Sequence, residues 1–289
     1  MTTTHRYTNY DTWAWLYNET MGPDYGKAQL KLLRRVLLPE LPPNAAILDL
    51  CCGTGQLMQP LLEARYQVTG LDGSAAMLDY ARQNAPQGHY LLDDARTFHL
   101  PDEFDAAFST SASLNHIMTL ADLTLVFRNV YQALRPGGLF VFDLNHPDQM
   151  QKWWRKRIAE GEITARYAWR LTPEYHPETS EGAFHVEIFQ AQPPASGLAR
   201  LMHPLRQSLY RLLSLRRLNR FRLRLLSRFE KIEPTWTRSH LTYPVKGHNL
   251  PDVQAALEAV GFTDITLQTI DGNPALDANH SAHFICRKP

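Results

Sequence analysis

The feature that constrains this sequence most is a repeated order of apolar strand, short loop and amphipathic helix, which begins at Ile47. Apolar runs typical of strands occupy residues 47–50, 67–71, 90–92, 104–109 and 139–143. Helical spacing between them predicts helices over 55–64, 74–83 and 122–134. Strands that alternate with helices form a parallel sheet covered on both faces, so we predict a doubly wound, mostly parallel α/β fold. Ligands of such sheets bind at the carboxyl ends of the strands, where the strand order reverses.

The segments on either side follow other patterns. Residues 10–38 carry aromatic and leucine side chains at helical spacing. After Pro147, strands are expected over 163–171, 183–191 and 235–243, with a turn-rich stretch at 172–182. A helix over 250–260 and two closing strands, 262–270 and 282–288, end the chain. We therefore expect four parts: an N-terminal helical lid (1–40), a core (41–149), an accessory antiparallel-sheet and helical lid (150–245), and a segment that completes the core sheet (246–289).

Composition narrows the class of protein. The chain has 289 residues, a formal net charge of +1 and three cysteines, of which Cys51 and Cys52 are adjacent. This is neither a disulfide framework nor a spaced metal site, so we expect no metal and a reducing, cytoplasmic location. The N-terminal residues lack the apolar run of a signal peptide, and no stretch reaches the roughly 18 apolar residues that a membrane span needs.

The loop after the first strand, "ILDLCCGTGQ" (47–56), indicates a ligand site. A loop between strand and helix directs backbone N–H groups and the positive helix end at a ligand, and small residues allow a close approach. Met58 occupies the third glycine position of a dinucleotide fingerprint, and no Gly-Lys-Ser/Thr follows as in a P-loop. Asp72 ends the second strand, 17 residues after Gly55, where a carboxylate can accept from ribose hydroxyls. The loop predicts an adenosine-type ligand without a pyrophosphate.

Four motifs in this order resemble one family. "ILDLCCGTGQ", "GLDGSAAML", "LLDDARTFHLPDEFDAAFS" and "ALRPGGLFVFDL" follow the order and spacing of class I S-adenosylmethionine (SAM)-dependent methyltransferases of the small-molecule type. The resemblance covers residues 40–145 and, less closely, "LEAVGFTDITL" near the C-terminus. It implies a Rossmann-like, seven-stranded fold and SAM as the cofactor. One departure is Cys51, where the family usually has its first glycine; a side chain this small leaves the loop intact.

The resemblance also implies cofactor-binding residues. Cys51, Gly53 and Gly55 would hold the amino-acid part of SAM, and Asp72, with Gly73 beside it, would bind the ribose. At the adenine, the implied residues are Met77, Asp94 and Ala95, with Asp93 as an alternative to Asp94. Ser109 and Thr110 would lie under the methionine moiety. The plain alternatives are that Met77 only packs its helix, that Asp72 only caps one, and that Cys51 and Cys52 are packing residues rather than nucleophiles.

Candidates for the acceptor side are weaker. The aromatic N-terminal segment resembles the lead helix of small-molecule methyltransferases, which makes Tyr10, Tyr17 and Tyr25 lid candidates. An aromatic stripe that packs on the core is the alternative for Trp13 and Trp15. The loops after the fourth and fifth strands contain Asn115, His116, Asn145 and His146. A histidine takes up a proton near neutral pH, so His116 and His146 are candidate general bases, with Tyr17 as a further catalytic candidate. His240 on the accessory strand is a lesser one.

The stretch from Arg200 to Lys231 is strongly basic. It holds ten Lys/Arg and one acid, which leaves 20 basic and 28 acidic residues elsewhere, a net charge of −8. Its apolar residues are spaced three or four apart, which predicts one amphipathic helix, or two, with an apolar stripe: Leu201, Leu205, Leu209, Leu212, Leu215, Leu218, Phe221, Leu225 and Phe229. The basic face could pack on the acidic body or on a second subunit, as in a homo-oligomer, or lie on a membrane surface.

A nucleic-acid partner is not expected, because "STSASLNHI" after the fourth strand lacks the motifs of base-modifying enzymes. The sequence thus predicts an enzyme that methylates an N or O atom of a small-molecule acceptor. The alternatives are an RNA methyltransferase that uses the basic stretch, and a SAM-binding regulatory protein without transfer activity.

Overall fold

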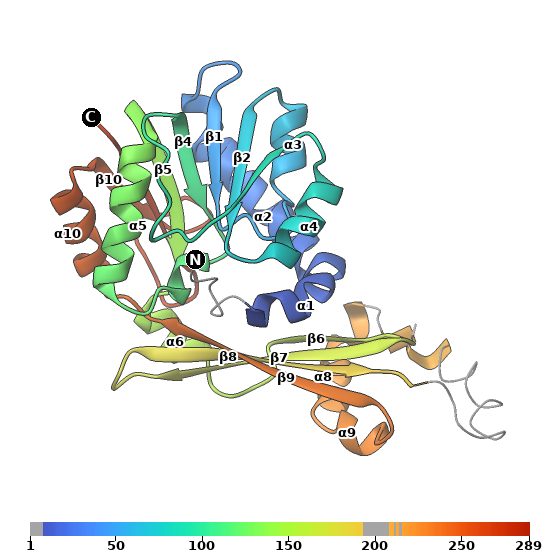
Figure 1. The fold of residues 1–289 in the computed structure, drawn as a ribbon. Coiled ribbons are helices and arrows are strands. Elements are labelled where there is room, and N and C mark those ends of the chain that lie inside the picture. The colour runs from blue at the N-terminus through green and yellow to red at the C-terminus, as the bar shows by residue number, and fades with distance from the viewer. Residues whose placement is uncertain (1–7, 193–207, 211, 214–215) are drawn as a thin grey trace. The chain divides into compact units, whose positions relative to one another are not determined.

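The computed structural model describes residues 8–192, 208–210, 212–213 and 216–289. The chain forms two compact units (Figure 1). The first runs to Met150 and resumes at Lys246, and the second comprises Gln151–Val245. Each unit is built on one sheet of the described residues.

The first unit contains a seven-stranded sheet in the order β10-β11-β5-β4-β1-β2-β3. Its strands are β1 Ala46–Leu50, β2 Gln67–Asp72, β3 His89–Leu92, β4 Phe104–Ser109, β5 Leu134–Leu144, β10 Thr263–Gln268 and β11 Ala282–Arg287. Every hydrogen-bonded pair among β1 to β5 is parallel, whereas β11 is antiparallel to both β5 and β10. The chain passes from β1 to β2 and β3 on one side and then to β4 on the other. The strand order therefore reverses between β1 and β4, and the predicted fold class is confirmed.

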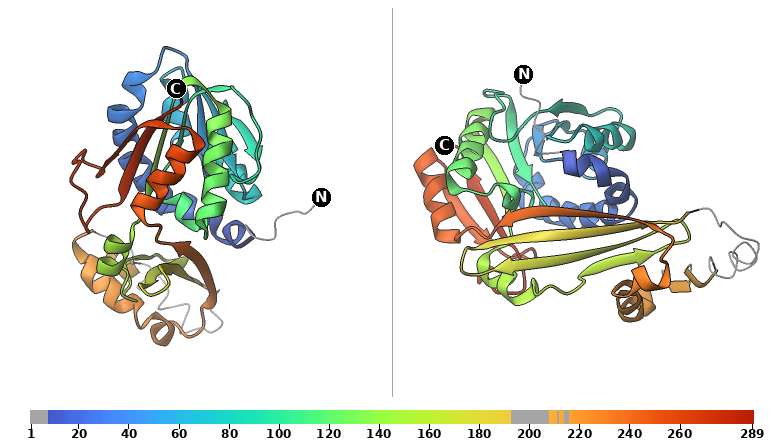
Figure 2. Two further views of the ribbon diagram at one scale, coloured as in Figure 1. Left: turned by 90° about the vertical axis from the view of Figure 1, so that its left-hand side faces the viewer. Right: turned by 60° about the horizontal axis from the view of Figure 1, so that its bottom comes forward.

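Helices cover both faces of this sheet (Figure 2). They are α1 Thr8–Glu19, α2 Met21–Val36, α3 Met58–Glu63, α4 Ala75–Asn84, α5 Leu120–Ala133, α6 Pro147–Trp153 and α10 Leu250–Val260, with short 3-10 turns η2 Leu38–Glu40 and η3 Ser113–His116. Side chains of α5 and α10 pack on one face and those of α2 and α3 on the other. Adjacent residues Ile47 and Leu48 of β1 belong to these two different clusters, as the alternation of a strand requires.

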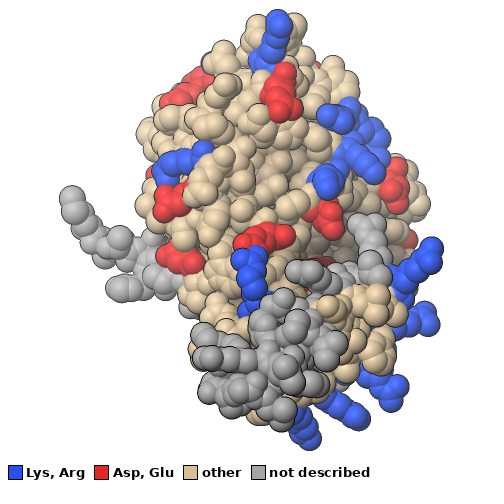
Figure 3. Space-filling view, turned by 90° about the vertical axis from the view of Figure 1, so that its right-hand side faces the viewer, with Lys and Arg blue, Asp and Glu red and all other residues tan. Residues whose placement is uncertain are grey.

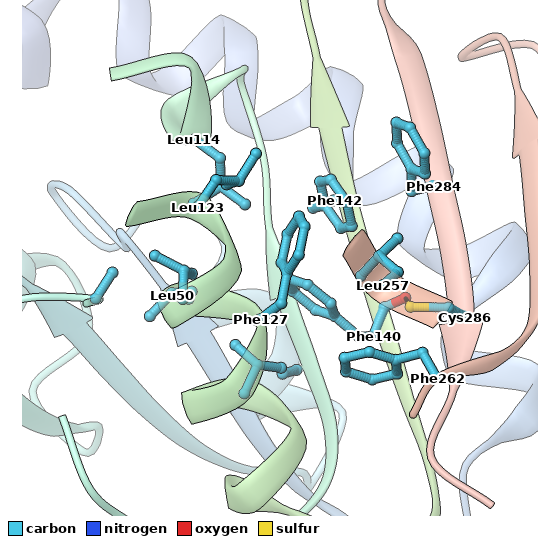
Figure 4. Packing of buried hydrophobic residues seen from close by; sticks show 14 of the residues in the cluster. Leu50, Leu114, Leu123, Phe127, Phe140, Phe142, Leu257, Phe262, Phe284 and Cys286 are labelled. Atoms are coloured by element: carbon cyan, nitrogen blue, oxygen red, sulfur yellow. Dashed lines mark hydrogen bonds between the residues drawn. The ribbon is translucent and has the colours of Figure 1, made fainter. Parts of the chain in front are cut away.

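The core beneath α5 and α10 is rich in phenylalanine (Figure 4). Phe142 of β5 stacks on Phe284 of β11, with ring centroids 4.8 Å apart, and on Phe140, at 4.7 Å. Phe127 of α5 meets both β5 rings. Burying large aromatic side chains supplies much of a domain's stability, so this cluster holds β11 against the parallel part of the sheet.

The N-terminal segment forms two helices that break at Thr20. Pro23 lacks the N–H that would bond to the carbonyl of Glu19, so one continuous helix cannot pass through this point. The side chain of Asp11 on α1 accepts hydrogen bonds at the start of α4, from the Ser74 hydroxyl (2.6 Å) and the Ala76 N–H (3.2 Å). A carboxylate is stabilised at a helix N-terminus, and this contact places α1 beside α4.

Strand β5 begins earlier than expected, at Leu134 rather than at 139. We predicted that "RPGG" (135–138) would separate helix from strand. Instead Leu134 pairs with Phe104 and Leu139 with Ala106, so the intervening residues bulge out of the ladder. Gly137, with φ of +80°, supplies the left-handed backbone of the bulge.

The second unit contains an antiparallel sheet in the order β6-β7-β8-β9. Its elements are β6 Glu160–Ile163, β7 Tyr167–His176, β8 Glu181–Gln190, β9 Thr237–Lys246, η4 Arg216–Leu218, α8 Asn219–Leu226 and α9 Phe229–Ile232. The stretch 172–182, expected as a loop, is mostly strand, because Thr172–His176 pair with Glu181–His185. Glu174 on β7 forms an ion pair with Lys156 and a hydrogen bond with His185 of β8 (3.3 Å), so cross-strand contacts continue to this end of the hairpin.

The predicted nine-residue apolar stripe packs only in part. Leu201, Leu205 and Leu215 lie outside the described residues, and Leu209, Leu212 and Phe221 are exposed. Phe229 is buried, and Leu218 and Leu225 pack against the same cluster. Tyr210, Leu213 and Leu226, which are not part of the predicted stripe, are buried there too. The segment breaks into short helices, so one continuous helical period does not apply to it. Among the described helices, none combines the length and the apolar composition that a membrane crossing requires.

Gly55, in the loop after β1, generates a stability prediction. Gly55 has φ of +70°, and a Cβ there would lie 3.0 Å from Cβ of Ala81 on α4. Gly137 has φ of +80° with open space around it, which makes it a matched control. A left-handed alanine costs about 1–2 kcal/mol at either site. We expect Gly55→Ala to lower the melting temperature clearly more than Gly137→Ala, because overlap in a packed site costs a further 1–3 kcal/mol, roughly. Equal shifts in calorimetry would contradict the close packing of the loop on α4.

Candidate functional site

A pocket of the first unit lies at the carboxyl ends of β1 and β4, where the strand order reverses. Its lining comes from α1, α2, the end of β1 and the loops after β1 and β4: Tyr17, Gly22, Gly26, Asp49, Cys51, Cys52, Gly53, Thr54, Gln56, Leu57, Thr110, Ser111 and Ser113. Four of the predicted cofactor-binding residues, Tyr17, Cys51, Gly53 and Thr110, thus line one pocket. The other predicted site residues are not part of the pocket lining.

The loop after β1 is tied to the end of β2 by Asp72. Its carboxylate accepts hydrogen bonds from the N–H of Gly53 (2.8 Å) and of Ser74 (2.9 Å). The loop reaches this position through left-handed backbone at Cys51, Gly53 and Gly55. Glycine adopts such angles without strain, and Cys51 adopts one (φ 62°) where the related family usually has glycine. Each carboxylate oxygen of Asp72 thus accepts from one backbone N–H, and the Gly53 bond ties it to the loop that it was predicted to accompany.

Asp49 is an acid inside an otherwise apolar strand, and sequence reasoning missed it. Its side chain is 3% exposed and lines the pocket. Burial, and next the negative charge of Asp72, raise its pKa well above the usual value. The pKa of Asp72 is raised as well, chiefly by burial. No lysine, arginine or histidine is among the described residues that line the pocket, so these acids have no basic side chain there to offset them.

The two cysteines of the loop are not activated thiols. Burial is the largest cause that raises the pKa of both Cys51 and Cys52, and the charges of Asp49 and Asp72 raise it further. Their thiols stay protonated near neutral pH, which agrees with packing roles. The Ser109 hydroxyl at the end of β4 is buried near Cys51 and has no hydrogen-bond partner among the described residues.

The N-terminal helices close against this loop. A Cβ at Gly26 of α2 would lie 2.8 Å from Cβ of Gln56, so α2 approaches the loop too closely for a larger residue. Asn18 accepts hydrogen bonds from Gln56 (3.1 Å) and from Asn84 of α4 (2.6 Å). Tyr17 lines the pocket and meets Trp13 edge to face.

The other aromatic candidates lie apart from the pocket lining. Tyr10 of α1 packs edge to face on His116, with ring centroids 5.6 Å apart. Tyr25 on α2 does not line the pocket; its hydroxyl lies 4.0 Å from the sulfur of Met21. His116 follows β4 on η3, so α1 and the loop after β4 meet at the same edge of the sheet.

The residues implied for adenine lie beyond β2 and β3. Met77 is buried on α4, and its N–H donates to the capping Ser74 hydroxyl (3.1 Å). The carboxylate of Asp94 is bound by the Arg96 guanidinium, with Nε 2.9 Å from Oδ1. Asp93 is exposed, and its Oδ1 accepts from the N–H of Asp94 (2.7 Å). Ala95 belongs to the core cluster under α5.

Asn115, Asn145 and His146 have structural contacts. The Asn115 amide donates to the carbonyls of Asn145 (2.8 Å) and Lys246 (2.7 Å), and its oxygen accepts from the N–H of Asn145 (2.9 Å). Nε2 of the buried His146 lies 3.1 Å from the carbonyl of Asp277 and therefore donates to it. This contact makes Nε2 the protonated ring nitrogen and leaves Nδ1 as the nitrogen that would accept a proton. His240 belongs to the second unit, where its ring stacks on His185.

Sequence reasoning also missed the hydroxyl and amide groups of the pocket, which are Thr54, Gln56, Ser111 and Ser113. Thr54 and Gln56 belong to the quoted loop, so its polar residues were a visible signal. Ser111 and Ala112 adopt left-handed backbone, and Asp143 on β5 accepts from the N–H of Ala112 (3.0 Å). This tertiary contact had no local sequence signal. Among the described residues, no group of three or more His, Cys, Asp and Glu side chains could hold a metal ion.

Comparison with known proteins shows what the first unit resembles. Residues 47–138 match the sequence profile of the methyltransferase domain family. The first unit has a Rossmann-like methyltransferase fold. An uncharacterized methyltransferase of Synechocystis is 36% identical over 133 residues, which are 45% of this chain and 62% of the relative. A dTDP-3-amino-3,4,6-trideoxy-α-D-glucopyranose N,N-dimethyltransferase of Streptomyces venezuelae is 27% identical over 145 residues, 50% of this chain and 57% of that protein. The chain therefore spans less than two thirds of either relative.

Solved structures show that the likeness in fold extends past this domain. A SAM-dependent methyltransferase from Clostridium acetobutylicum has a TM-score of 0.68 at 15% identity, over 96% of this chain and 98% of that one. The sugar N-methyltransferase KedS8 from Streptoalloteichus has a TM-score of 0.68 at 18% identity, over 94% and 91%. The seven-stranded sheet of the methyltransferase domain and the antiparallel sheet are thus both part of a known fold.

The buried acids of the methyltransferase domain predict a pH dependence of stability. The folded-state pKa of Asp49 is raised. Its contribution to the free energy of unfolding is therefore complete below the unfolded pKa of about 3.9 and is lost as pH rises through the raised pKa. Asp49→Asn removes this loss. We expect the melting temperature of the variant to rise relative to that of the wild type as the pH increases above about 4. The corresponding gain in the free energy of unfolding is about 1.4 kcal/mol per unit of pKa shift. Asp79→Asn, at an exposed position of α4, is the control. A difference that does not change with pH would contradict the assignment.

Proposed function

We propose that this protein transfers a methyl group from SAM to an N or O atom of a small-molecule acceptor. The observation that carries the proposal is the pocket between β1 and β4, whose buried acid Asp49 has no basic side chain beside it. A ligand with a positively charged ammonium and sulfonium supplies the missing countercharge. The shape of the loop supports the same ligand: a Cβ on Gly53 would have only the Tyr17 ring within 4 Å, at 3.9 Å, so the space between them is open.

The proposed division of roles follows the geometry. Asp49 opposes the positive charge, and Asp72 accepts from the ribose hydroxyls with the lone pairs that Gly53 and Ser74 do not use. Thr110, Ser111 and Ser113 offer hydroxyl groups on the β4 side of the pocket, and Tyr17 closes it from α1. We keep Met77, Asp94 and Ala95 as the proposed adenine-binding residues. The carboxylate of Asp94 would then bind both the adenine and Arg96.

Bound SAM supplies a methyl group already activated by its sulfonium, so little bond chemistry is left to the protein. The chain's own task is to orient the acceptor, exclude water and accept a proton where the acceptor loses one. His116 is our candidate for that proton, since it lies on the turn after β4, under Tyr10. His146 stays a second candidate: its Nε2–H donates to the carbonyl of Asp277, and its Nδ1 would accept the proton.

The names of the similar proteins support the acceptor class. They include N,N-dimethyltransferases of dTDP-amino sugars, a sugar N-methyltransferase and malonyl-[acyl-carrier protein] O-methyltransferases. For the second unit we propose a part in acceptor recognition. It has a pocket of its own, about 310 Å³, lined by Gln151, Trp154, Arg155, Lys156, Glu174, Tyr175, His176 and Pro177. Three cysteines without disulfides support a reducing, cytoplasmic location.

The cofactor assignment is tested by calorimetric titration with SAM. Asp72→Asn keeps the size of the side chain but removes its charge, and a hydrogen bond to a charged group is worth about 1.5–3 kcal/mol. We expect the affinity for SAM to fall at least about tenfold. Asp79→Asn on the surface of α4 serves as the control and should leave the affinity unchanged. Equal affinity of both variants would refute the role of Asp72, and no heat with the wild type would refute the proposed cofactor.

The proton acceptor is tested by kinetics with a panel of small amines and hydroxyl compounds. If His116 accepts the proton, His116→Ala should lower turnover about 100-fold while the affinity for SAM stays the same. His99→Ala, an exposed histidine, is the control. Full activity of His116→Ala would mean that positioning alone carries the reaction. Methylation of RNA in place of the panel would favour the RNA alternative, and SAM binding without any transfer would favour the regulatory one.

A further inference from the structure

The outward side of α8 and its flanking turns gathers positive charge around one aromatic ring. Arg217, Arg220, Phe221, Arg224 and Arg228 are all exposed, and we call them the arginine surface. Their spacing of three or four residues places them on one side of the helical segment. Phe221 is 55% exposed, so a large apolar side chain stands in water among four guanidinium groups.

Packing of the opposite side fixes this orientation. Leu226 is fully buried in the cluster with Ile163, Phe189 and Phe229, and Leu223 packs against the same cluster. Arg222 also points inward, and it donates to the carbonyls of Gly161 (2.9 Å) and Leu213 (3.1 Å). The arginine surface cannot turn inward without breaking these contacts.

The charges of the arginine surface lack acidic partners among the described residues. Other arginines of the same unit are paired: Arg170 and Arg238 both bind Glu187, and Arg238 also binds Glu230 at 2.9 Å. Glu230, the one acid between Arg200 and Lys231, is thus already used. Lysine and arginine side chains project along the lower margin of Figure 3 with no acidic side chain between them. Uncompensated charge of one sign on a small surface attracts a partner of the opposite sign.

Exposed apolar side chains accompany this charge. Leu212 is 53% exposed, and the carbonyl of the next residue, Leu213, accepts from Arg222 of α8. Ile232 on α9 is 41% exposed. Large apolar side chains beside arginines match the two layers of a membrane surface, since the guanidinium groups reach phosphates while the apolar side chains enter the acyl boundary. A nucleic acid would use the cations but would offer nothing apolar to Leu212 and Ile232.

We infer that the arginine surface, together with the exposed Leu212 and Ile232 of the same helical segment, docks this protein on an anionic lipid membrane. Each basic residue close to such a surface contributes about fivefold to the binding constant at physiological ionic strength. Four arginines then give reversible binding that depends on the anionic lipid and is lost when salt screens the charges. The inference does not depend on the methyl acceptor.

The experiment is vesicle flotation of the full chain. Vesicles of phosphatidylcholine alone are compared with vesicles that contain about one third phosphatidylserine, at low salt and at about 1 M salt, where the Debye length falls to about 3 Å. We expect binding only to the anionic vesicles at low salt. Arg217→Glu/Arg220→Glu/Arg224→Glu should weaken it at least about 100-fold. Phe221→Ser should weaken it measurably and leave the salt dependence in place.

Matched controls separate this surface from general effects of charge. Lys31→Glu/Arg34→Glu/Arg128→Glu makes the same change of charge at exposed positions of α2 and α5, and Leu125→Ser matches Phe221→Ser. Both controls should float like the wild type, and circular dichroism should show that every variant is folded. The inference is overturned if the wild type ignores anionic vesicles, if the two triple variants lose binding equally, or if the arginine surface binds single-stranded RNA and not lipid.

Discussion

The carboxylate of Asp72 is the contact on which the pocket depends. By accepting from Gly53 and Ser74, it joins the loop after β1 to the loop after β2. Ser74 in turn caps α4 and donates to Asp11 of α1, so the N-terminal helix is joined to the same point. Three segments far apart in the sequence are thus held at one edge of the sheet. Breaking this contact would loosen the loop and the helix that closes on it together.

Charge is distributed between the two units in opposite senses. In the first unit, Asp49 and Asp72 are buried at the end of the sheet, where their pKa values are raised. In the second, arginines stand exposed without acidic partners among the described residues. A buried acid without a countercharge suits a cationic ligand, and an exposed cation suits an anionic surface. The same electrostatic rule therefore leads to two different ligands on one chain.

Local patterns predicted the elements of the first unit well. Strands β1, β2 and β4 were found from short apolar runs, and α10 was found from its spacing and from Gly261 at its end. The errors lie where pairing overrides propensity. Gly137 lies in a bulge inside β5 instead of ending a segment, and the hairpin of β7 and β8 continues through Pro173 because cross-strand partners hold it. The short helices around α8 lack the one long period that their leucines suggested.

The sequence by itself determined the α/β class, the ligand-binding loop and the acid at the end of β2, because these depend on residues close together in the chain. The tertiary structure decided what surrounds them. Only the fold shows that Asp49 is buried near Asp72, and only the fold shows that the ring of His146 is held by the carbonyl of Asp277. Burial and hydrogen-bond partners come from residues distant in sequence, and these two quantities set whether a polar side chain is reactive or structural.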